Sequence, residues 1–507
     1  MQNQAPKRKP AAKSNPGGTK VGKPRNSKSN TGKPKAAKSN AGKTRSERSN
    51  AGRPSAVKRR SRSRGKAPAL EKLVQCWVLL FLPTYLLLCV EGGFKHISEF
   101  KTELFYGFSA VLAVLASDLF WMDYARLRRG KRDGALKTAL ALSPARLAAL
   151  CYLGFVLLSA ALSPHGSAAW YDAADHEATL TQACYVLIFC AVSRWARPTK
   201  GLRLVLLACT AVYCAVILLQ LRGRNPFGLY PSGMDYYSVQ MRPSYLFAGT
   251  TGNGDLVSAL LSLMAGFCFC TAFVGEKREL APRAAALVLG LVCFYEMGRI
   301  GVLCGIVGTV AGLLLSLFVL MKVNRRTKGF CLLGAAAGGV GMLGFLWKYP
   351  TDVTFFQEIH SILHGNISDR FGSGRVYIWR QMIARVPGQI WFGCGPDTAR
   401  RSDLTPFRRY SSTGHLLEAI ITDAHCLPLQ ILYTQGVFAL LTWLVLLGIV
   451  LTGWFRREGR TPMLAALGGA AVCFWFTMLF CFSSVIAMPF FWVALGLMAG
   501  ETEAVDS

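Results

Sequence analysis

The sequence predicts an all-α polytopic membrane protein with about twelve transmembrane helices, and three observations carry this prediction. Of the 507 residues, 52% are hydrophobic and only 17% are charged. Apolar runs recur along the chain, and about 20 apolar residues in a helix cross the hydrocarbon core of a bilayer. Basic residues gather in alternate connecting segments, as the positive-inside rule requires. A soluble protein of this length would distribute its charge throughout, so that class is excluded.

The first 68 residues form a strongly basic tail. Residues 1–66 hold 21 Lys and Arg against a single acid, Glu47, and so contribute +20 of the formal net charge of +31. The tail consists mostly of Lys, Arg, Ser, Asn, Gly, Pro and Ala, which leaves almost nothing to bury, and we expect it to be disordered. We interpret it as a solvated cytoplasmic extension that helps to fix topology. Contact with anionic lipid headgroups is the alternative, ahead of binding to nucleic acid.

A membrane domain of residues 69–500 follows the tail, and residues 501–507 form a short C-terminal tail. The predicted spans are 72–92, 103–123, 144–163, 178–195, 202–221, 254–274, 284–297, 301–321, 329–347, 427–450, 462–482 and 484–500. Basic segments fall in every second connection, at 126–132, 193–200, 276–283, 322–329 and 455–460. This alternation predicts that both termini are cytoplasmic and that the bundle has two substantial outward segments, 222–253 and 348–426.

The outward segment 348–426 is rich in arginine, although its predicted side of the membrane is normally poor in basic residues. These arginines are Arg370, Arg375, Arg380, Arg385, Arg400, Arg401, Arg408 and Arg409. Because the planar guanidinium group binds phosphate through two hydrogen bonds, this density points to an anionic ligand, although a solvated charged face explains most of the arginines.

Within this segment, apolar residues recur at helical spacing, which predicts an amphipathic helix along the membrane surface. The residues on its apolar side are Val376, Ile378, Trp379, Met382, Ile383 and Val386. We expect Pro387 and the following glycines to break this helix and to form a tight turn.

His425 is the candidate catalytic residue, because it stands immediately before a long apolar run that begins near 427. A histidine with a near-neutral pKa can act as a general base, and Asp423 could orient it. The cysteines show no zinc-ligand spacing with histidine, so the sequence offers no candidate zinc site. Whether Cys394 and Cys426 form a disulfide is left open by the sequence.

Four segments resemble the O-antigen ligase and polymerase superfamily over about residues 240–450. They are GSGRVYIWRQMIARVPGQIWFGCGPDTA, DAHCLPLQILYTQGVFALLTWLVLL, EMGRIGVLCGIVGTVAGLLL and, more weakly, RPSYLFAGTTGNGDLVSALLSL. The chain departs from the family pattern in three places. Cys426 stands where the family has Asn, Gly298 replaces a Ser, and residues 252–255 replace an Asn-Pro-Asn motif.

The resemblance implies a GT-C-like helical bundle in a bacterial plasma membrane. It implies an enzyme that, without metal or nucleotide, moves a glycan from a polyprenyl-diphosphate-linked donor to a glycan or lipid-linked acceptor on the outer face. Matching positions assign catalysis to His425 and Asp423, and binding of the donor pyrophosphate to Arg299, Arg375 and Arg242.

Two other classes remain as alternatives. Twelve helices with inward termini are also typical of a transporter or flippase of lipid-linked saccharides, but the chain shows no two-fold internal repeat and few charges within the spans. A non-catalytic membrane scaffold would leave the ordered arginines and histidine unexplained. Within the enzyme class, the sequence does not separate a ligase from a polymerase.

Overall fold

The computed structural model describes residues 69–90, 96–129, 142–171, 176–229, 249–275, 278–410 and 416–506, all within the unit Arg64–Ser507. The predictions for the basic tail and for Arg242 fall outside these residues.

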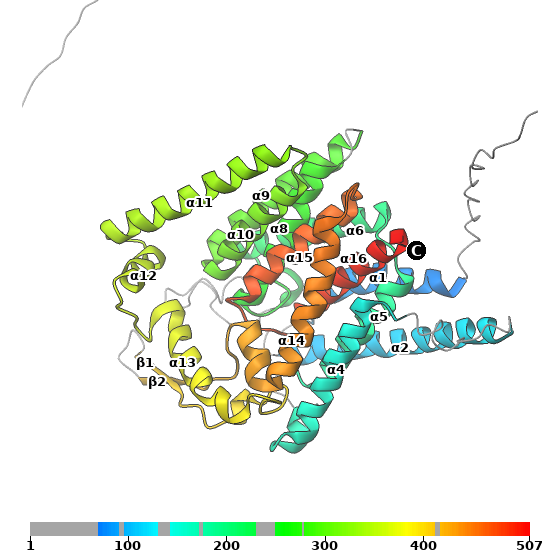
Figure 1. Cartoon of the computed structure of the whole chain (residues 1–507), viewed down its shortest axis with the longest axis horizontal. Helices are drawn as coiled ribbons and strands as arrows, with labels where there is room; N and C mark the ends of the chain where they lie inside the picture. The colour runs from blue at the N-terminus through cyan, green and yellow to red at the C-terminus, as the bar shows by residue number, and fades with distance from the viewer. Residues whose placement is uncertain are drawn as a thin grey trace, which may run out of the picture. The chain divides into compact units, whose positions relative to one another are not determined.

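The described chain is a helical bundle, as the sequence predicts, and each predicted span falls on a helix (Figure 1). These helices are α1 (Ala69–Leu87), α2 (Ile97–Arg129), α4 (Pro144–Leu162), α5 (Thr179–Trp195), α6 (Lys200–Leu221), α8 (Gly254–Val274), α9 (Leu280–Ile300), α10 (Leu303–Leu320), α11 (Arg325–Lys348), α14 (Leu427–Arg456), α15 (Pro462–Met478) and α16 (Met488–Asp506). Eight of them are long and apolar enough to cross a membrane, and α1, α15 and α16 contain shorter apolar stretches. The polytopic all-α class is therefore confirmed, while the number of crossings stays a prediction.

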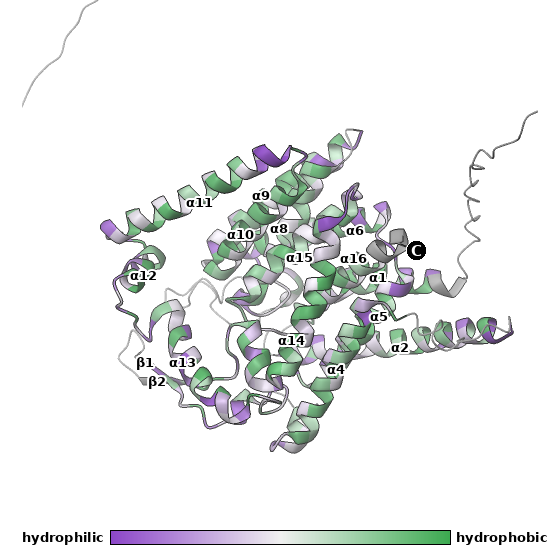
Figure 2. Ribbon diagram, viewed as in Figure 1, coloured by the Kyte–Doolittle hydropathy of each residue, from purple (hydrophilic) through white to green (hydrophobic). Residues whose placement is uncertain are grey.

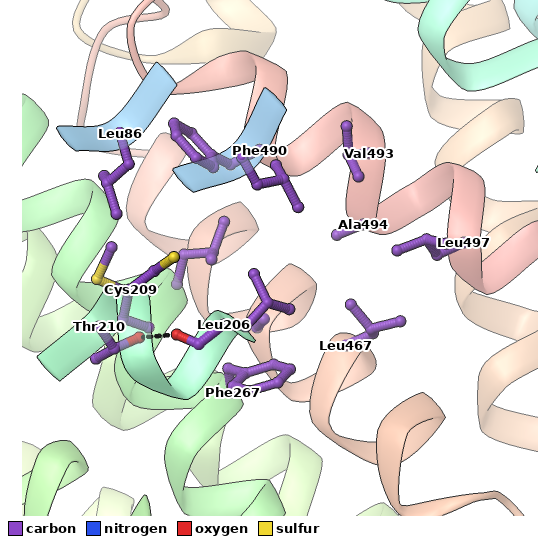
Figure 3. A pocket seen from close by; sticks show the side chains of 14 residues that line it. Leu86, Leu206, Cys209, Thr210, Phe267, Leu467, Phe490, Val493, Ala494 and Leu497 are labelled. Atoms are coloured by element: carbon purple, nitrogen blue, oxygen red, sulfur yellow. Dashed lines mark hydrogen bonds between the residues drawn. The ribbon is translucent and has the colours of Figure 1, made fainter. Parts of the chain in front are cut away.

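Apolar side chains dominate the helices, as Figure 2 shows in green, and small residues let the central helices approach closely. A Cβ on Gly266 of α8 would lie 2.5 Å from the carbonyl oxygen of Gly469 in α15, so these backbones touch. Figure 3 shows an apolar cavity among α1, α6, α8, α15 and α16. The hydroxyl of Thr210, which is among its lining residues, donates to Leu206 O at 2.9 Å within α6.

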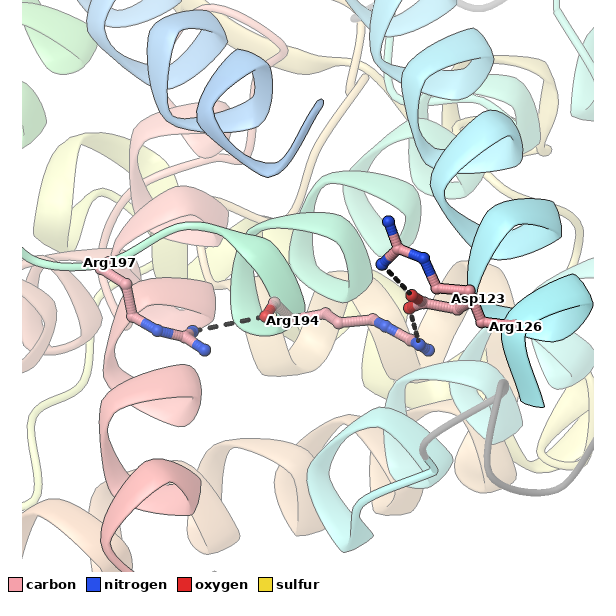
Figure 4. A network of polar contacts seen from close by, with 4 residues as sticks. All are labelled: Asp123, Arg126, Arg194 and Arg197. Atoms are coloured by element: carbon pink, nitrogen blue, oxygen red, sulfur yellow. Dashed lines mark hydrogen bonds and ion pairs between the residues drawn. The ribbon is translucent and has the colours of Figure 1, made fainter. Parts of the chain in front are cut away.

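Three of the basic segments predicted to be cytoplasmic meet at one end of the bundle. Arg194, at the end of α5, forms an ion pair with Asp123 of α2 at 2.7 Å, and Arg126 lies 3.9 Å from the same carboxylate (Figure 4). Arg203 of α6 pairs with Glu279, just before α9, at 2.6 Å. Their common location agrees with the predicted alternation, and the side of the membrane they face stays a prediction.

α1 is shorter than predicted, because the side chain of Lys101 takes up its last carbonyl groups. The fully buried ammonium group of Lys101 donates to Tyr85 O, to Leu86 O and, at 2.8 Å, to Leu88 O. The helix therefore ends at Leu87, before the predicted end of the span at residue 92.

The outward segment 348–426 contains two amphipathic helices and one hairpin. The helices are α12 (Thr354–Leu363) and α13 (Phe371–Gln389), and β1 (Phe407–Tyr410) pairs antiparallel with β2 (Leu416–Ala419). The hairpin was not predicted. The predicted break is found, although not at Pro387 itself: α13 passes Pro387, ends at Gln389, and the turn follows.

Part of the predicted apolar side of α13 packs against other residues of the protein. Met382 and Val386 are buried in a small cluster with Ile421, Ala424 and Tyr433, whereas Ile383 remains 57% exposed. The cysteines Cys394 and Cys426 are both free thiols.

Candidate active site

A break in α14 receives the turn that follows α13. At Gly436 the helix leaves helical geometry, with φ 85° and ψ 177°. The turn then bonds to the interrupted helix: Val437 N–H donates to Ile390 O at 2.8 Å, and Gly395 N–H donates to Thr434 O at 2.8 Å. Irregular backbone in a membrane helix is tolerated where other protein groups satisfy its polar atoms, and this turn does so.

Glycine is required on both sides of this junction. A Cβ on Gly436 would lie 2.2 Å from the carbonyl oxygen of Trp391, and a Cβ on Gly393 would lie 2.3 Å from the carbonyl carbon of Thr434. The two glycines of the quoted motifs therefore serve one contact, which fixes the end of α13 against α14.

This junction sets His425 in place, because α13 and α14 both hold the peptide that precedes it. Trp379 of α13 donates its Nε1–H to Ala424 O at 2.8 Å. Ala424 N–H donates to Oε1 of Gln430 in α14 at 2.9 Å. His425 itself has φ 48°, a left-handed conformation that is uncommon outside glycine and often marks a functional residue.

Asp423 contacts the backbone of His425. The buried carboxylate of Asp423 accepts a hydrogen bond from His425 N–H, which stabilises the unusual backbone conformation. The ring of His425 packs edge-on against Phe482, with 5.4 Å between centroids. The described contact thus orients His425 through its main chain.

Arg375 and His425 form an electrostatically coupled pair. Arg375, in the first turns of α13, donates to Gly372 O at 2.7 Å, while its Nε is buried without a hydrogen-bond partner. Nδ1 of His425 is buried and equally unpartnered. Burial, and secondarily the charge of Arg375, lower the pKa of His425 from 6.5 to about 4, so the imidazole is neutral at physiological pH.

Asp255 is a third charged residue of this site, and the sequence motifs gave it no role. The side chain of Asn253 caps α8 and places Asp255 in its first turn. The charges of Asp255 and Arg375 interact, and Asp255 O accepts from the thiol of Cys481, which precedes Phe482. Asn253, a residue type that often caps helices, was the feature of the sequence that could have pointed to Asp255.

The other predicted arginines are less closely tied to His425. Arg299 is exposed in the last turn of α9, and its guanidinium group donates to the hydroxyl of Tyr295 at 3.2 Å and lies over that ring. Among the contacts that the structure describes, none joins Arg299 to Arg375 or His425.

Several arginines of the outward segment have structural partners instead. Arg380 pairs with Asp369 at 2.6 Å, and Arg408 of β1 pairs with Glu418 of β2 at 2.8 Å. These contacts agree with the interpretation that most of the arginines form a solvated charged face, whereas the charge of Arg375 acts on His425.

Fold and site together define a multi-pass membrane protein in which a neutral histidine lies beside an arginine at the end of a membrane helix. No group of His, Cys, Asp and Glu side chains with metal-site geometry occurs among the residues described above. The histidine and the arginine are the groups to which the resemblance assigns catalysis and donor binding, and the comparison with known families tests that resemblance.

Residues 284–444 match the family model described as O-Antigen ligase. This match supports the resemblance to the O-antigen ligase and polymerase superfamily that the motifs predict. It therefore indicates a ligase- or polymerase-type enzyme of a bacterial membrane, and the family implies lipid-linked glycan substrates. The matched region runs from α9 to α14 and contains Arg299, Arg375, Asp423 and His425. No curated protein showed significant similarity to the chain.

Proposed function

We propose that the protein transfers a glycan from a polyprenyl-diphosphate carrier to an acceptor hydroxyl at the extracytoplasmic face of the cytoplasmic membrane. The observation that carries this proposal is that Nδ1 of His425 and Nε of Arg375 are both buried without a hydrogen-bond partner, and that the charge of Arg375 acts on His425, which precedes a membrane helix. A base and a fixed cation are the two groups that this reaction requires.

His425 is the general base. The acceptor oxygen attacks the anomeric carbon, its proton passes to the imidazole, and the bond from the anomeric carbon to the diphosphate oxygen breaks with both electrons leaving on the diphosphate. Positioned proton transfer of this kind contributes a factor of about 10² to 10⁴ in rate. Asp423 holds the backbone of the base.

Arg375 stabilises the diphosphate leaving group. Removing one preorganised donor to developing negative charge costs about 3–4 kcal/mol in other enzymes. The donor's negative charge also offsets that of Arg375, so that its binding raises the pKa of His425 and strengthens the base when substrate is present.

Arg299 and Arg242 are proposed as further contacts to the donor diphosphate. The exposed guanidinium group of Arg299 is available to a headgroup that approaches from the bilayer, because its described partner is only the hydroxyl of Tyr295. The reaction written above needs neither metal nor cofactor. The topology that places this site outside the cell, with both termini inside and the basic tail near anionic lipid, belongs to the same proposal.

Complementation of a deletion strain tests the proposal. The His425→Ala and Arg375→Ala variants should abolish surface polymer and accumulate diphosphate-linked precursor at unchanged protein level. Arg299→Ala and Arg242→Ala should reduce the polymer, and Arg380→Ala is the matched control. Chain length of the wild-type product separates a ligase from a polymerase.

A flippase of lipid-linked saccharide is the second candidate, since a multi-span bundle with inward termini also suits a carrier. Normal polymer from His425→Ala would refute the catalytic assignment. Loss of precursor transport, measured in inverted vesicles that lack acceptor, would then favour the carrier.

A further inference from the structure

A second cluster of buried polar side chains lies against the other side of the α13–α14 junction. Its centre is Glu177, which precedes α5 and is only 6% exposed. One carboxylate oxygen accepts from the hydroxyl of Tyr185 at 2.6 Å, and the other accepts from Nε2 of Gln182 at 2.8 Å. Three polar groups are thus held together where an apolar interior would be expected.

Glu177 is bonded to the turn that follows α13. Its backbone N–H donates to Oδ2 of Asp397 at 2.8 Å, and Asp397 is buried with φ 56°. The same turn donates to α14 through Cys394 N–H and Gly395 N–H. Glu177 therefore links the start of α5 to the junction that holds His425.

A second path runs through α4. The hydroxyl of Tyr152 lies 2.9 Å from Oε1 of Gln182 and 2.9 Å from Oε1 of Gln435, one residue before the break at Gly436. Glu177 and Gln435 also line a small polar cavity.

The cluster reaches the catalytic backbone through one side chain. Gln430 lines the same polar cavity and accepts the hydrogen bond of Ala424 N–H, next to His425. The cavity lined by Glu177 and Gln435 is therefore also bounded by the side chain that holds Ala424 N–H, while Trp379 holds Ala424 O.

We propose that Glu177 is a positioning residue that holds His425 in its catalytic geometry through the Asp397 turn and through Gln182, Tyr152 and Gln435. This inference rests on the proposed function of His425. A displacement of about 1 Å in a catalytic group can cost about 10²-fold in rate, and a buried network transmits the loss of one member because its remaining partners must move to find new hydrogen bonds.

An exchange of side chains tests the network. Glu177→Gln keeps only one acceptor oxygen for the two donors, Gln182 Nε2 and the Tyr185 hydroxyl, and Gln182→Glu sets two carboxylates together. Each single variant should lower kcat by about 10- to 100-fold while the KM for the lipid-linked donor stays the same. The double variant Glu177→Gln/Gln182→Glu restores the hydrogen bond between the two side chains with reversed roles and loses only the bond from residue 182 to the Glu177 carbonyl, so it should recover a large part of kcat.

The assay uses the full-length protein in lipid nanodiscs, a polyprenyl-diphosphate-linked glycan as donor, and rates per folded molecule. Tyr213→Phe, a buried tyrosine whose hydroxyl lies 3.4 Å from Thr251 in another part of the bundle, is the control and should leave kcat unchanged. If the single variants do not fold, Tyr185→Phe removes one hydrogen bond of Glu177 and should still lower kcat.

Parallel measurement of His425→Ala separates two failures. If His425→Ala is inactive but the Glu177 variants keep wild-type kcat, only the positioning role is refuted. If His425→Ala is active, the proposed function fails. A double variant that folds but does not recover kcat also contradicts the network.

Discussion

Substitution of Gly436 by alanine should separate the two halves of the α13–α14 junction. Gly436 has φ 85° and ψ 177°, a conformation essentially restricted to glycine, and the added Cβ would lie 2.2 Å from Trp391 O. The added Cβ would collide with a backbone atom, so no side chain can move aside to make room for it.

The expected cost follows from these two effects. Strained backbone costs about 1–3 kcal/mol, and an extra methyl group in a packed site costs about 1–3 kcal/mol. The total of about 2–6 kcal/mol compares with a typical net stability of about 5–15 kcal/mol. The chain can relieve the strain by parting the turn from the helix, which would break the hydrogen bonds of Val437 and Gly395 and shift the backbone that leads to His425.

The assay compares Gly436→Ala with Gly448→Ala in the same helix, where an added Cβ meets nothing within 4 Å. Thermal unfolding in nanodiscs should show a lower midpoint for Gly436→Ala only, and its transfer rate per folded molecule should fall. Wild-type melting and activity for Gly436→Ala would refute the argument that this junction positions the site.

Three further outcomes are expected. In donor-free enzyme, the acidic limb of kcat/KM should lie near the His425 pKa of about 4, since protonation removes the base as pH falls, and a limb centred near 6.5 would contradict this. Trp379→Phe leaves the carbonyl of Ala424 without its indole donor, at a cost of about 1–3 kcal/mol, and should therefore lower both the melting temperature and kcat. Unchanged values for both would show that this hydrogen bond is dispensable. Arg380→Ala should change stability by at most about 1 kcal/mol and leave the surface polymer intact, because its pair with Asp369 is exposed, and a loss of polymer would place Arg380 in the site.

Hydropathy and charge alternation located the membrane helices well, because both follow from transfer of side chains into hydrocarbon and need no tertiary information. Helix ends were less accurate. α1 stops at Leu87 because a lysine of the next helix takes its carbonyls, and α13 passes Pro387 before it ends at Gln389. Both depend on neighbours that local composition does not reveal.

The site was predictable in kind but not in arrangement. His425, Asp423 and Arg375 carry motifs that can be recognised along the chain, and the structure sets them together. Arg299 also belongs to a recognisable motif, yet it is exposed and its guanidinium group contacts Tyr295. Asp255 interacts with the charge of Arg375, although no motif assigned it a role.

The sequence by itself predicted the membrane class, the approximate spans, the resemblance to the superfamily and the histidine proposed as the base, because these depend on residue type and spacing. Only the tertiary structure decided that Gly393 and Gly436 form one junction, that Asp423 holds a backbone N–H, and that Glu177 and Asp397 link α5 to the turn before α14. Those contacts join residues up to 220 positions apart, and their geometry follows from packing of the whole bundle.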